Sequence, residues 1–239
     1  MQLIKDIYNK SLSLILSVVF PNTCLGCGEV IPEGEFFCYY CTEHMPIIET
    51  DKHCKRCGLS KKKCECNKKI FCFDCIAAPF YNIGAAKNAM YIFKFRKRPY
   101  ISAYFANRMA ITVKYAFYGI RFDGICYVPL SSKSLRKRGF NQSREIAVHM
   151  SRLLKIPLIE NALGCKNKKK SQHTVSRDKR EENVKGVYYP KGKIKGRILL
   201  VDDIKTTGAT LNECSKQLLI AGADSVYCIT GIITGNKKG

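Results

Sequence analysis

One segment, residues 197–210 with the sequence RILLVDDIKTTGAT, constrains the fold of this chain more than any other. Residues 198–201 are continuously apolar, which is typical of a strand buried on both faces of a parallel sheet. The run ends in two adjacent acids, Asp202 and Asp203, and a threonine-rich loop leads from them into a helical pattern. Because open α/β sheets bind ligands beyond the carboxyl ends of their strands, we expect a ligand site at this point.

The loop after the two acids is suited to binding phosphate. Backbone N–H groups at the start of the following helix attract anions, and Gly208 allows the backbone to approach closely. The residues expected to line the site are Asp202, Asp203, Thr206, Thr207, Gly208, Ala209 and Thr210. Two carboxylates beside a phosphate would repel it unless they bind ribose hydroxyls, or a divalent cation that bridges to those hydroxyls.

Strand and helix patterns alternate around this segment. Strands are predicted at 76–81, 124–130, 197–202 and 225–230, and helices at 84–95, 101–118, 141–154 and 208–221. Such alternation is typical of a mainly parallel sheet with helices on both faces. The predicted fold class is therefore α/β, in a domain spanning residues 76–239.

Ten of the fourteen cysteines lie between residues 24 and 75, in closely spaced pairs. Such pairs are typical of zinc ribbons, because each forms a turn that presents two thiolates to one ion. The first predicted zinc site consists of Cys24, Cys27, Cys38 and Cys41. The second is predicted to consist of Cys54, Cys57, Cys64 and Cys66, and Cys72 with Cys75 is the alternative to its last pair. Two closed four-thiolate sites are structural rather than catalytic.

The zinc-ribbon module is predicted over residues 22–75, and two expectations accompany it. Residues 70–81 are aromatic and β-branched, so we expect a strand in which Cys72 is a core residue. His44 and His53 are expected to be solvated, because four thiolates already complete each zinc shell. Clustered cysteines of this kind favour a reducing cytoplasm.

The N-terminal segment, residues 1–21, contains an apolar stretch that is too short to span a bilayer, which takes roughly 20 apolar residues. We expect no transmembrane segment here, but an amphipathic helix that packs on the protein or attaches it peripherally to the inner face of the membrane. The chain carries a formal net charge of +22. This excess favours polyanionic partners such as nucleic acid or phosphorylated metabolites, although generally lysine-rich surfaces give the same composition.

The segment 198–210 resembles the phosphoribosyl pyrophosphate (PRPP) signature of type I phosphoribosyltransferases. The resemblance implies that Asp202 and Asp203 face the ribose 2′ and 3′ hydroxyls and that residues 206–210 hold the 5′-phosphate. It also implies that magnesium accompanies PRPP. The fold expected for residues 76–239 is then that of a type I phosphoribosyltransferase, preceded by the zinc-ribbon module.

The remaining motifs are similar in order to those of the ComF family of competence proteins along nearly the whole chain. They are FKFR at 93–96, VPL at 128–130, LRKRGFNQ at 135–142 and QHTVSRDKREEN at 172–183. This resemblance implies a role in natural transformation, with single-stranded DNA and proteins of the DNA-uptake machinery as partners. The chain departs from the family at Lys97, where a small residue is usual.

Basic residues follow the strand predicted at 124–130. Arg136 and Arg138 are expected to clamp a pyrophosphate group through paired N–H donors, with a solvated charge run as the alternative. Asn141 is expected to cap the next helix. The nearby aromatic residues are explained mainly as helix or strand core: Tyr91, Phe93, Phe95, Tyr100 and Phe140.

Two functions fit these patterns. The first is a ComF-type protein that binds PRPP or a related sugar phosphate and handles single-stranded DNA. The alternative is a metabolic phosphoribosyltransferase, a glycosyltransferase that moves phosphoribose to a nitrogen acceptor. The sequence reveals neither an acceptor pocket nor a catalytic nucleophile, and a metabolic enzyme has no need of the charge of +22. The first function is therefore favoured, and whether turnover occurs is left open.

Overall fold

The structure, a computed structural model, describes residues 21–49, 51–64, 66, 70–167 and 184–235. The helix predicted within residues 1–21, apart from Pro21, and the motif at 172–183 lie outside the described residues. In the described ranges, no helix combines the length and the apolar character needed to cross a membrane.

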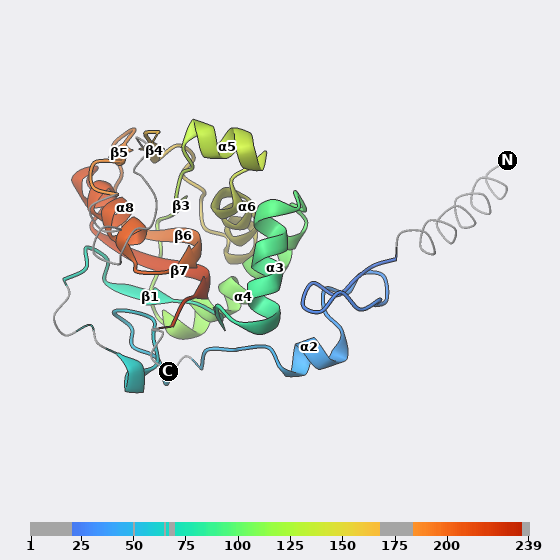
Figure 1. The fold of residues 1–239 in the computed structure, drawn as a ribbon. Helices are drawn as coiled ribbons and strands as arrows, with labels where there is room; N and C mark the ends of the chain where they lie inside the picture. The colour runs from blue at the N-terminus through green and yellow to red at the C-terminus, as the bar shows by residue number, and fades with distance from the viewer. Residues whose placement is uncertain (1–20, 50, 65, 67–69, 168–183, 236–239) are drawn as a thin grey trace, which may run out of the picture.

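A parallel sheet forms the centre of the molecule (Figure 1). Its strands, in spatial order, are β1 (Cys75–Ala77), β7 (Ser225–Ile233), β6 (Arg197–Lys205) and β3 (Gly124–Tyr127). All neighbouring pairs are parallel, and β2 (Phe80–Tyr81) pairs with the last residues of β7. This arrangement confirms the α/β class. The single strand expected at 70–81 is instead two short strands, since Pro79 between them has no backbone N–H to donate.

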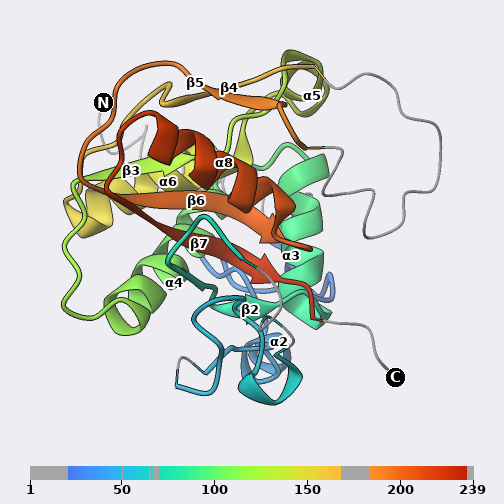
Figure 2. The same cartoon turned by 90° about the vertical axis from the view of Figure 1, so that its left-hand side faces the viewer.

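Helices cover both faces of this sheet, as Figure 2 shows. One face carries α3 (Gly84–Phe95), α4 (Ile101–Ala116) and α6 (Gln142–Leu154), and the other carries α8 (Ala209–Ile220). The apolar residues of β6 pack against the helices on both faces of the sheet. Leu199 and Val201 are buried with the first group of helices, whereas Ile198 and Leu200 are buried with α8. Because helices cover both faces of the sheet, a central strand of this kind is apolar at consecutive positions rather than at alternate ones.

Three elements described in the sheet domain were not predicted: α5 (Ser132–Arg138) and the hairpin of β4 (Leu163–Cys165) and β5 (Tyr188–Pro190). The helix α5 begins where Ser131 accepts a hydrogen bond from the N–H of Ser134, and it ends at Gly139 with a φ of 87°. Its sequence, SKSLRKR, has a single apolar residue and therefore no hydrophobic period. The strands of the hairpin lie far apart in the sequence, so no local turn motif indicates their pairing.

The cysteine module contributes the short helices α2 (Tyr39–Glu43) and η1 (Lys61–Lys63) and packs against the sheet domain. Leu25 and Phe37 share a core with the alanines of α3. The side chain of Asn88 on α3 donates a hydrogen bond of 2.7 Å to the carbonyl of Gly26. Further along, the N–H of Ile76 in β1 donates to the carbonyl of Lys55 over 2.7 Å. The module is thus attached to the domain at two places.

Candidate functional site

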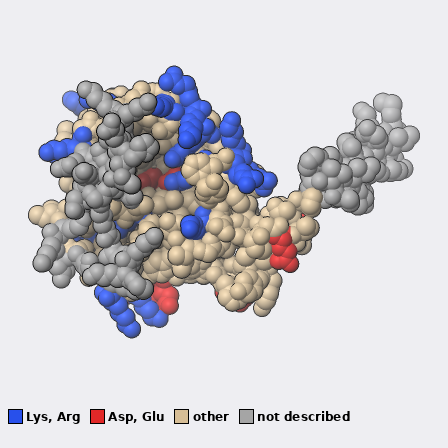
Figure 3. All heavy atoms as spheres, viewed as in Figure 1, with Lys and Arg blue, Asp and Glu red and all other residues tan. Residues whose placement is uncertain are grey.

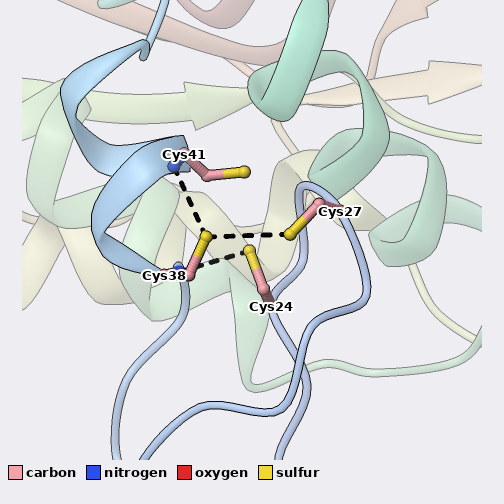
Figure 4. Close-up of side chains that lie close together, drawn as sticks. All are labelled: Cys24, Cys27, Cys38 and Cys41. Atoms are coloured by element: carbon pink, nitrogen blue, oxygen red, sulfur yellow. Dashed lines mark hydrogen bonds between the residues drawn. The ribbon is translucent and has the colours of Figure 1, made fainter.

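The first cysteine cluster brings its four sulfur atoms together, and all of them lie within 4.8 Å of one another (Figure 4). The Sγ atoms of Cys27 and Cys38 are 3.7 Å apart. Backbone N–H groups donate to two of the sulfurs: Cys38 N–H to Cys24 Sγ over 3.3 Å, and Cys41 N–H to Cys38 Sγ over 3.5 Å. Such donors stabilise thiolates, so the cluster fits a structural zinc ion.

Gly26 makes both this cluster and its docking possible. A Cβ atom at this position would lie 2.6 Å from Cys41 Sγ and 2.8 Å from the Cβ of Ala85 on α3. Only glycine therefore fits between the knuckle and the helix.

The second cluster consists of Cys54, Cys57, Cys64 and Cys66, again with all sulfurs within 4.8 Å of one another. The Sγ–Sγ distances include 3.5 Å between Cys54 and Cys66 and 3.6 Å between Cys57 and Cys64. This set fits a second structural zinc ion, and it is the predicted pairing rather than the alternative with Cys72 and Cys75.

Three residues near the clusters test the other expectations. Cys72 is half-buried rather than in the core, and its N–H donates over 2.6 Å to the side chain of Asn212 on α8. His44 is exposed as expected and stacks on Tyr40, with ring centroids 4.1 Å apart. The expectation for His53 was wrong, because its side chain is buried, with Nδ1 3.3 Å from the carbonyl oxygen of Glu49. The spacing of residues along the sequence gives no sign that His53 is buried.

The two acids lie inside β6 rather than after it, because the strand extends to Lys205. Both are buried, each 7% exposed. Asp202 Oδ1 accepts two hydrogen bonds of 2.9 Å, one from Ser143 Oγ on α6 and one from the N–H of Asp203. Burial raises the pKa of Asp202 to about 7, and the charge of Asp203 adds to that rise.

Asp203 is held by cations from two helices. Lys94 on α3 places Nζ 2.9 Å from Asp203 Oδ1, and Arg138 at the end of α5 places Nη1 4.0 Å from Oδ2. The side chains of Lys94 and Asp203 are only 14% and 10% exposed, so the pair is largely shielded from solvent. Lys94 was not predicted as a site residue. Its sequence signal is its place in the FKFR motif at 93–96, which was noted only for its resemblance to the family.

Ser143 was also missing from the predicted site, and Asn141 positions it. Asn141 caps α6 by accepting from the N–H groups of Ser143 and Arg144, and its own amide donates over 3.1 Å to the carbonyl of Val128. The start of α6 is therefore fixed against the end of β3, which brings the Ser143 hydroxyl to Asp202. The predicted cap at Asn141 is confirmed.

The predicted phosphate loop lies at the start of α8. Gly208 is the N-cap residue with a φ of 89°, in the left-handed region that favours glycine. No side chain caps this helix, and the Ala209 N–H reaches only the Thr207 hydroxyl at 3.3 Å. The amino end of α8 thus presents free backbone N–H groups just beyond the end of β6, the strand that carries the two acids, and a helix start of this kind can bind an anion.

The predicted arginine pair is divided by the structure. Arg138 is anchored at the site: besides Asp203, it donates over 3.1 Å to Gln142 Oε1 and lies 6.0 Å over the ring of Phe95. Arg136 is exposed on the same helix. Gln142 is buried, and its Nε2 has no hydrogen-bond partner within the described ranges. A buried donor in this state is suited to a bound ligand.

The aromatic residues near the site correct another expectation. Phe93 is fully buried, but Tyr91, Phe95 and Tyr100 each leave half or more of their surface exposed. Tyr91 and Phe95 lie one turn apart on α3 with ring centroids 4.9 Å apart. The helix α3 therefore presents an exposed aromatic face, and not only core residues. Lys97 follows it with a φ of 49°, a strained backbone for lysine that a small residue such as glycine would relieve.

Positive charge gathers around the site on the surface shown in Figure 3, over α5 and the carboxyl end of α3. Acidic atoms lie in the hollow that these cations border. The cations on α5 and in the segment just after α3 include Arg96, Arg98, Lys133, Arg136, Lys137 and Arg138. A hollow with acids inside and cations at its rim suits a ligand that combines hydroxyl and phosphate groups.

The double zinc ribbon domain family matches residues 15–76. The DNA utilization protein YhgH of Escherichia coli K12 is 28% identical over 226 residues, which cover 87% of this chain and 96% of that protein. The competence protein F of Haemophilus influenzae is 27% identical over 218 residues, covering 88% and 90%. The competence protein ComFC of Bacillus subtilis is 34% identical over 108 residues, covering 43% and 41%. These similarities confirm the resemblance of the chain to the ComF family of competence proteins.

Proposed function

We propose that the site between β6 and α8 binds a ribose phosphate, either PRPP or a related sugar phosphate, in a protein that acts in competence and DNA uptake. The observation that carries this proposal is that two buried carboxylates near the end of β6 are followed at once by the loop to the uncapped amino end of α8. Carboxylates accept hydrogen bonds from sugar hydroxyls, and a helix amino end binds phosphate. The same arrangement supports a phosphoribosyltransferase fold for the sheet domain.

The surroundings of the acids favour a sugar over a free anion. Ser143 and Lys94 hold Asp202 and Asp203 with their carboxylates at the base of the hollow. A free anion offers these carboxylates only further acceptors, whereas a sugar diol presents hydroxyl donors to them. Arg138 then lies at the rim, where a pyrophosphate group is proposed to bind, and it contacts the buried amide of Gln142. Magnesium, as the proposed companion of PRPP, belongs on the pyrophosphate oxygens in this arrangement.

The test of this site is a calorimetric titration of the zinc-replete protein with PRPP and magnesium, followed by a pyrophosphate-release assay. We expect binding by the wild-type protein and a loss of more than about 100-fold in affinity when Asp202→Asn and Asp203→Asn are combined, because both acceptors of the diol lose their charge. Retained binding by the folded double variant would refute the proposed site.

We further propose that single-stranded DNA lies along the exposed aromatic face of α3. Tyr91 and Phe95 offer flat surfaces for base stacking, and Arg98, bonded over 3.2 Å to Tyr100 Oη, offers positive charge beside them. Stacking platforms combined with cations are how proteins bind single strands without reading their sequence. The relatives named for competence and DNA utilization support a partner of this class.

The proposed DNA surface can be tested by fluorescence anisotropy with a labelled oligonucleotide. Replacing Tyr91 and Phe95 together with alanine should weaken binding by about tenfold or more, since stacking on one aromatic residue contributes on the order of 1–3 kcal/mol. Tyr115→Ala on α4 is the matched control, because Tyr115 is also strongly exposed. Affinity should also fall steeply as salt rises, and a flat salt dependence would argue against contacts with the DNA backbone.

A second candidate function, transfer of phosphoribose to a nitrogen acceptor, is favoured by one observation. A cavity of about 560 Å³ lies beside the loop after β3, walled by the start of α6 and by the β4–β5 hairpin. Its lining combines apolar side chains such as Leu135 and Tyr189 with the polar Asn161 and Glu145, which suits a heterocycle. Pyrophosphate release on adding a nitrogen base, with no requirement for DNA, would favour this alternative.

A further inference from the structure

We propose that Lys94 is the built-in counter-ion of the two acids, so that the site takes the ribose phosphate end of its ligand without a divalent cation on those acids. This inference rests on the proposed function and deepens it. It concerns the question raised by the sequence, namely what prevents two adjacent carboxylates from repelling a phosphate. The structure assigns that role to a lysine from another element.

The geometry around Asp203 leaves little room for a metal ion. Lys94 Nζ lies 2.9 Å from Oδ1, and Arg138 Nη1 lies 4.0 Å from Oδ2. A magnesium ion bound to this carboxylate would lie about 2.1 Å from an oxygen and would demand octahedral ligands. It would therefore have to displace an ammonium group that is already paired in a largely buried position, against the repulsion of two cations.

Asp202 is also occupied on one oxygen. Oδ1 accepts hydrogen bonds from Ser143 Oγ and from the N–H of Asp203. Hydrogen bonds fix the direction of this carboxylate, as the ion pair fixes that of Asp203. Two oriented carboxylates with their charge partly offset are suited to accept hydrogen bonds from a neutral cis-diol.

The helix α3 holds Lys94 in place by packing. Its buried residues Ala86, Met90 and Phe93 lie in the core beneath the sheet, and Lys94 follows in the last turn of the helix. A cation in the last turn of a helix is favoured by the helix dipole. The ammonium group therefore reaches Asp203 from a rigid element, which makes Lys94 a positioning residue rather than a mobile surface charge.

The experiment uses ribose 5-phosphate, which carries the diol and the phosphate but no pyrophosphate that would itself bind magnesium. Calorimetric titrations of the zinc-replete protein are made with and without added magnesium, and without a chelator, which would remove zinc. The variants are Lys94→Met, Lys94→Arg and the control Lys87→Met, which alters an exposed lysine on the same helix. Zinc content and thermal unfolding establish that each variant is folded.

We expect the wild-type protein and Lys87→Met to bind ribose 5-phosphate equally well with and without magnesium. Lys94→Met should lose about tenfold or more in affinity without magnesium and recover part of it when magnesium is added. The affinity of Lys94→Arg, which keeps the charge, should lie between those of the wild-type protein and Lys94→Met. A merely structural role for Lys94 would not create this new response to magnesium.

Two results would overturn the inference: a wild-type protein that binds ribose 5-phosphate only with magnesium, or Lys94→Met binding that matches wild type in both conditions. The first result stands on wild-type protein alone, so the inference remains testable even if Lys94→Met fails to fold. A wild-type protein that binds neither ribose 5-phosphate nor PRPP in any condition would instead refute the proposed function itself, and the inference with it.

Discussion

The two cysteine clusters are alike in composition but are attached to opposite layers of the molecule. The first shares its core with α3, α4 and α6, and Asn88 on α3 bonds to its knuckle. The second shares its core with α8, and the segment that follows it bonds to Asn212 on α8. Equivalent zinc sites therefore support different elements.

This difference matters because the proposed ligand site is divided in the same way. The helix α3 carries Lys94, which holds Asp203, whereas α8 starts with the loop proposed to hold phosphate. The first cluster thus packs with the half of the site proposed to face the sugar, and the second with the half proposed to face the phosphate. A zinc ion that is only structural can still determine how well one half of a distant site is formed.

The largest effect is expected from breaking the clusters one at a time. Cys38→Ser and Cys54→Ser should each lower the zinc content from about two ions per chain to about one, and each should destabilise the protein by more than about 3 kcal/mol, since zinc binding to a small module contributes on the order of 10 kcal/mol. Metal analysis and thermal unfolding measure both quantities. Cys72→Ser, outside both clusters, should keep two ions. One ion in the wild-type protein would show that only one cluster is a zinc site.

An intermediate effect is expected at Asp202, where the two halves meet. Its pKa of about 7 exceeds the ordinary value of 3.8, so between these values the folded protein binds a proton that the unfolded chain lacks. Stability without ligand should therefore fall as the pH rises from about 4 to about 7. Asp202→Asn removes this loss and can keep both hydrogen bonds to Oδ1, so it should be more stable than wild type by about 1–2 kcal/mol at pH 8.

Denaturant unfolding at pH 5 and pH 8 measures this difference, with the exposed Asp224→Asn as the control. The advantage of Asp202→Asn should shrink at the lower pH. A constant difference between the two pH values would show that the carboxyl of Asp202 titrates normally. The same variant should bind PRPP poorly, which would separate stability from function at one residue.

The smallest effects are expected from replacing the two asparagines that bond the cysteine module, and the segment after it, to α3 and α8. Asn88→Ala and Asn212→Ala each remove one hydrogen bond to the backbone and should cost about 1 kcal/mol. Hydrogen exchange should then quicken in different places: in α3 for Asn88→Ala and at the start of α8 for Asn212→Ala. Equal effects of both variants on both helices would contradict the division of the site between the two clusters.

The features that the sequence predicted are those set by neighbours along the chain. Cysteine spacing predicted both clusters, since metal ligands in a knuckle lie within a few residues of one another. The helix at 84–95 has the predicted bounds, and the α8 helix begins one residue after the predicted start, because Gly208 is its cap. Periodicity and turn chemistry determine such elements locally.

The features that the sequence did not predict depend on contacts between distant segments. Lys94 and Asp203 are 109 positions apart in the sequence, and they meet only once α3 is packed on the sheet. Ser143 reaches Asp202 in the same way. The short helix α5 has no apolar period to mark it, and His53 is buried by a fold-back of the zinc module. No spacing rule contains this information, because tertiary packing creates it.

The extension of β6 to Lys205 has a consequence for which molecules can compete for the site. Asp202 lies within the ladder to β7, opposite Thr230, so the backbone that carries it cannot shift to suit a different sugar. A rigid pair of acceptors should discriminate strictly between ribose and deoxyribose. A deoxyribose lacks one of the two hydroxyls and would leave one buried acceptor without a partner. If the proposed function holds, a DNA strand is therefore expected to compete poorly for this site, so that the two proposed ligands would not exclude each other.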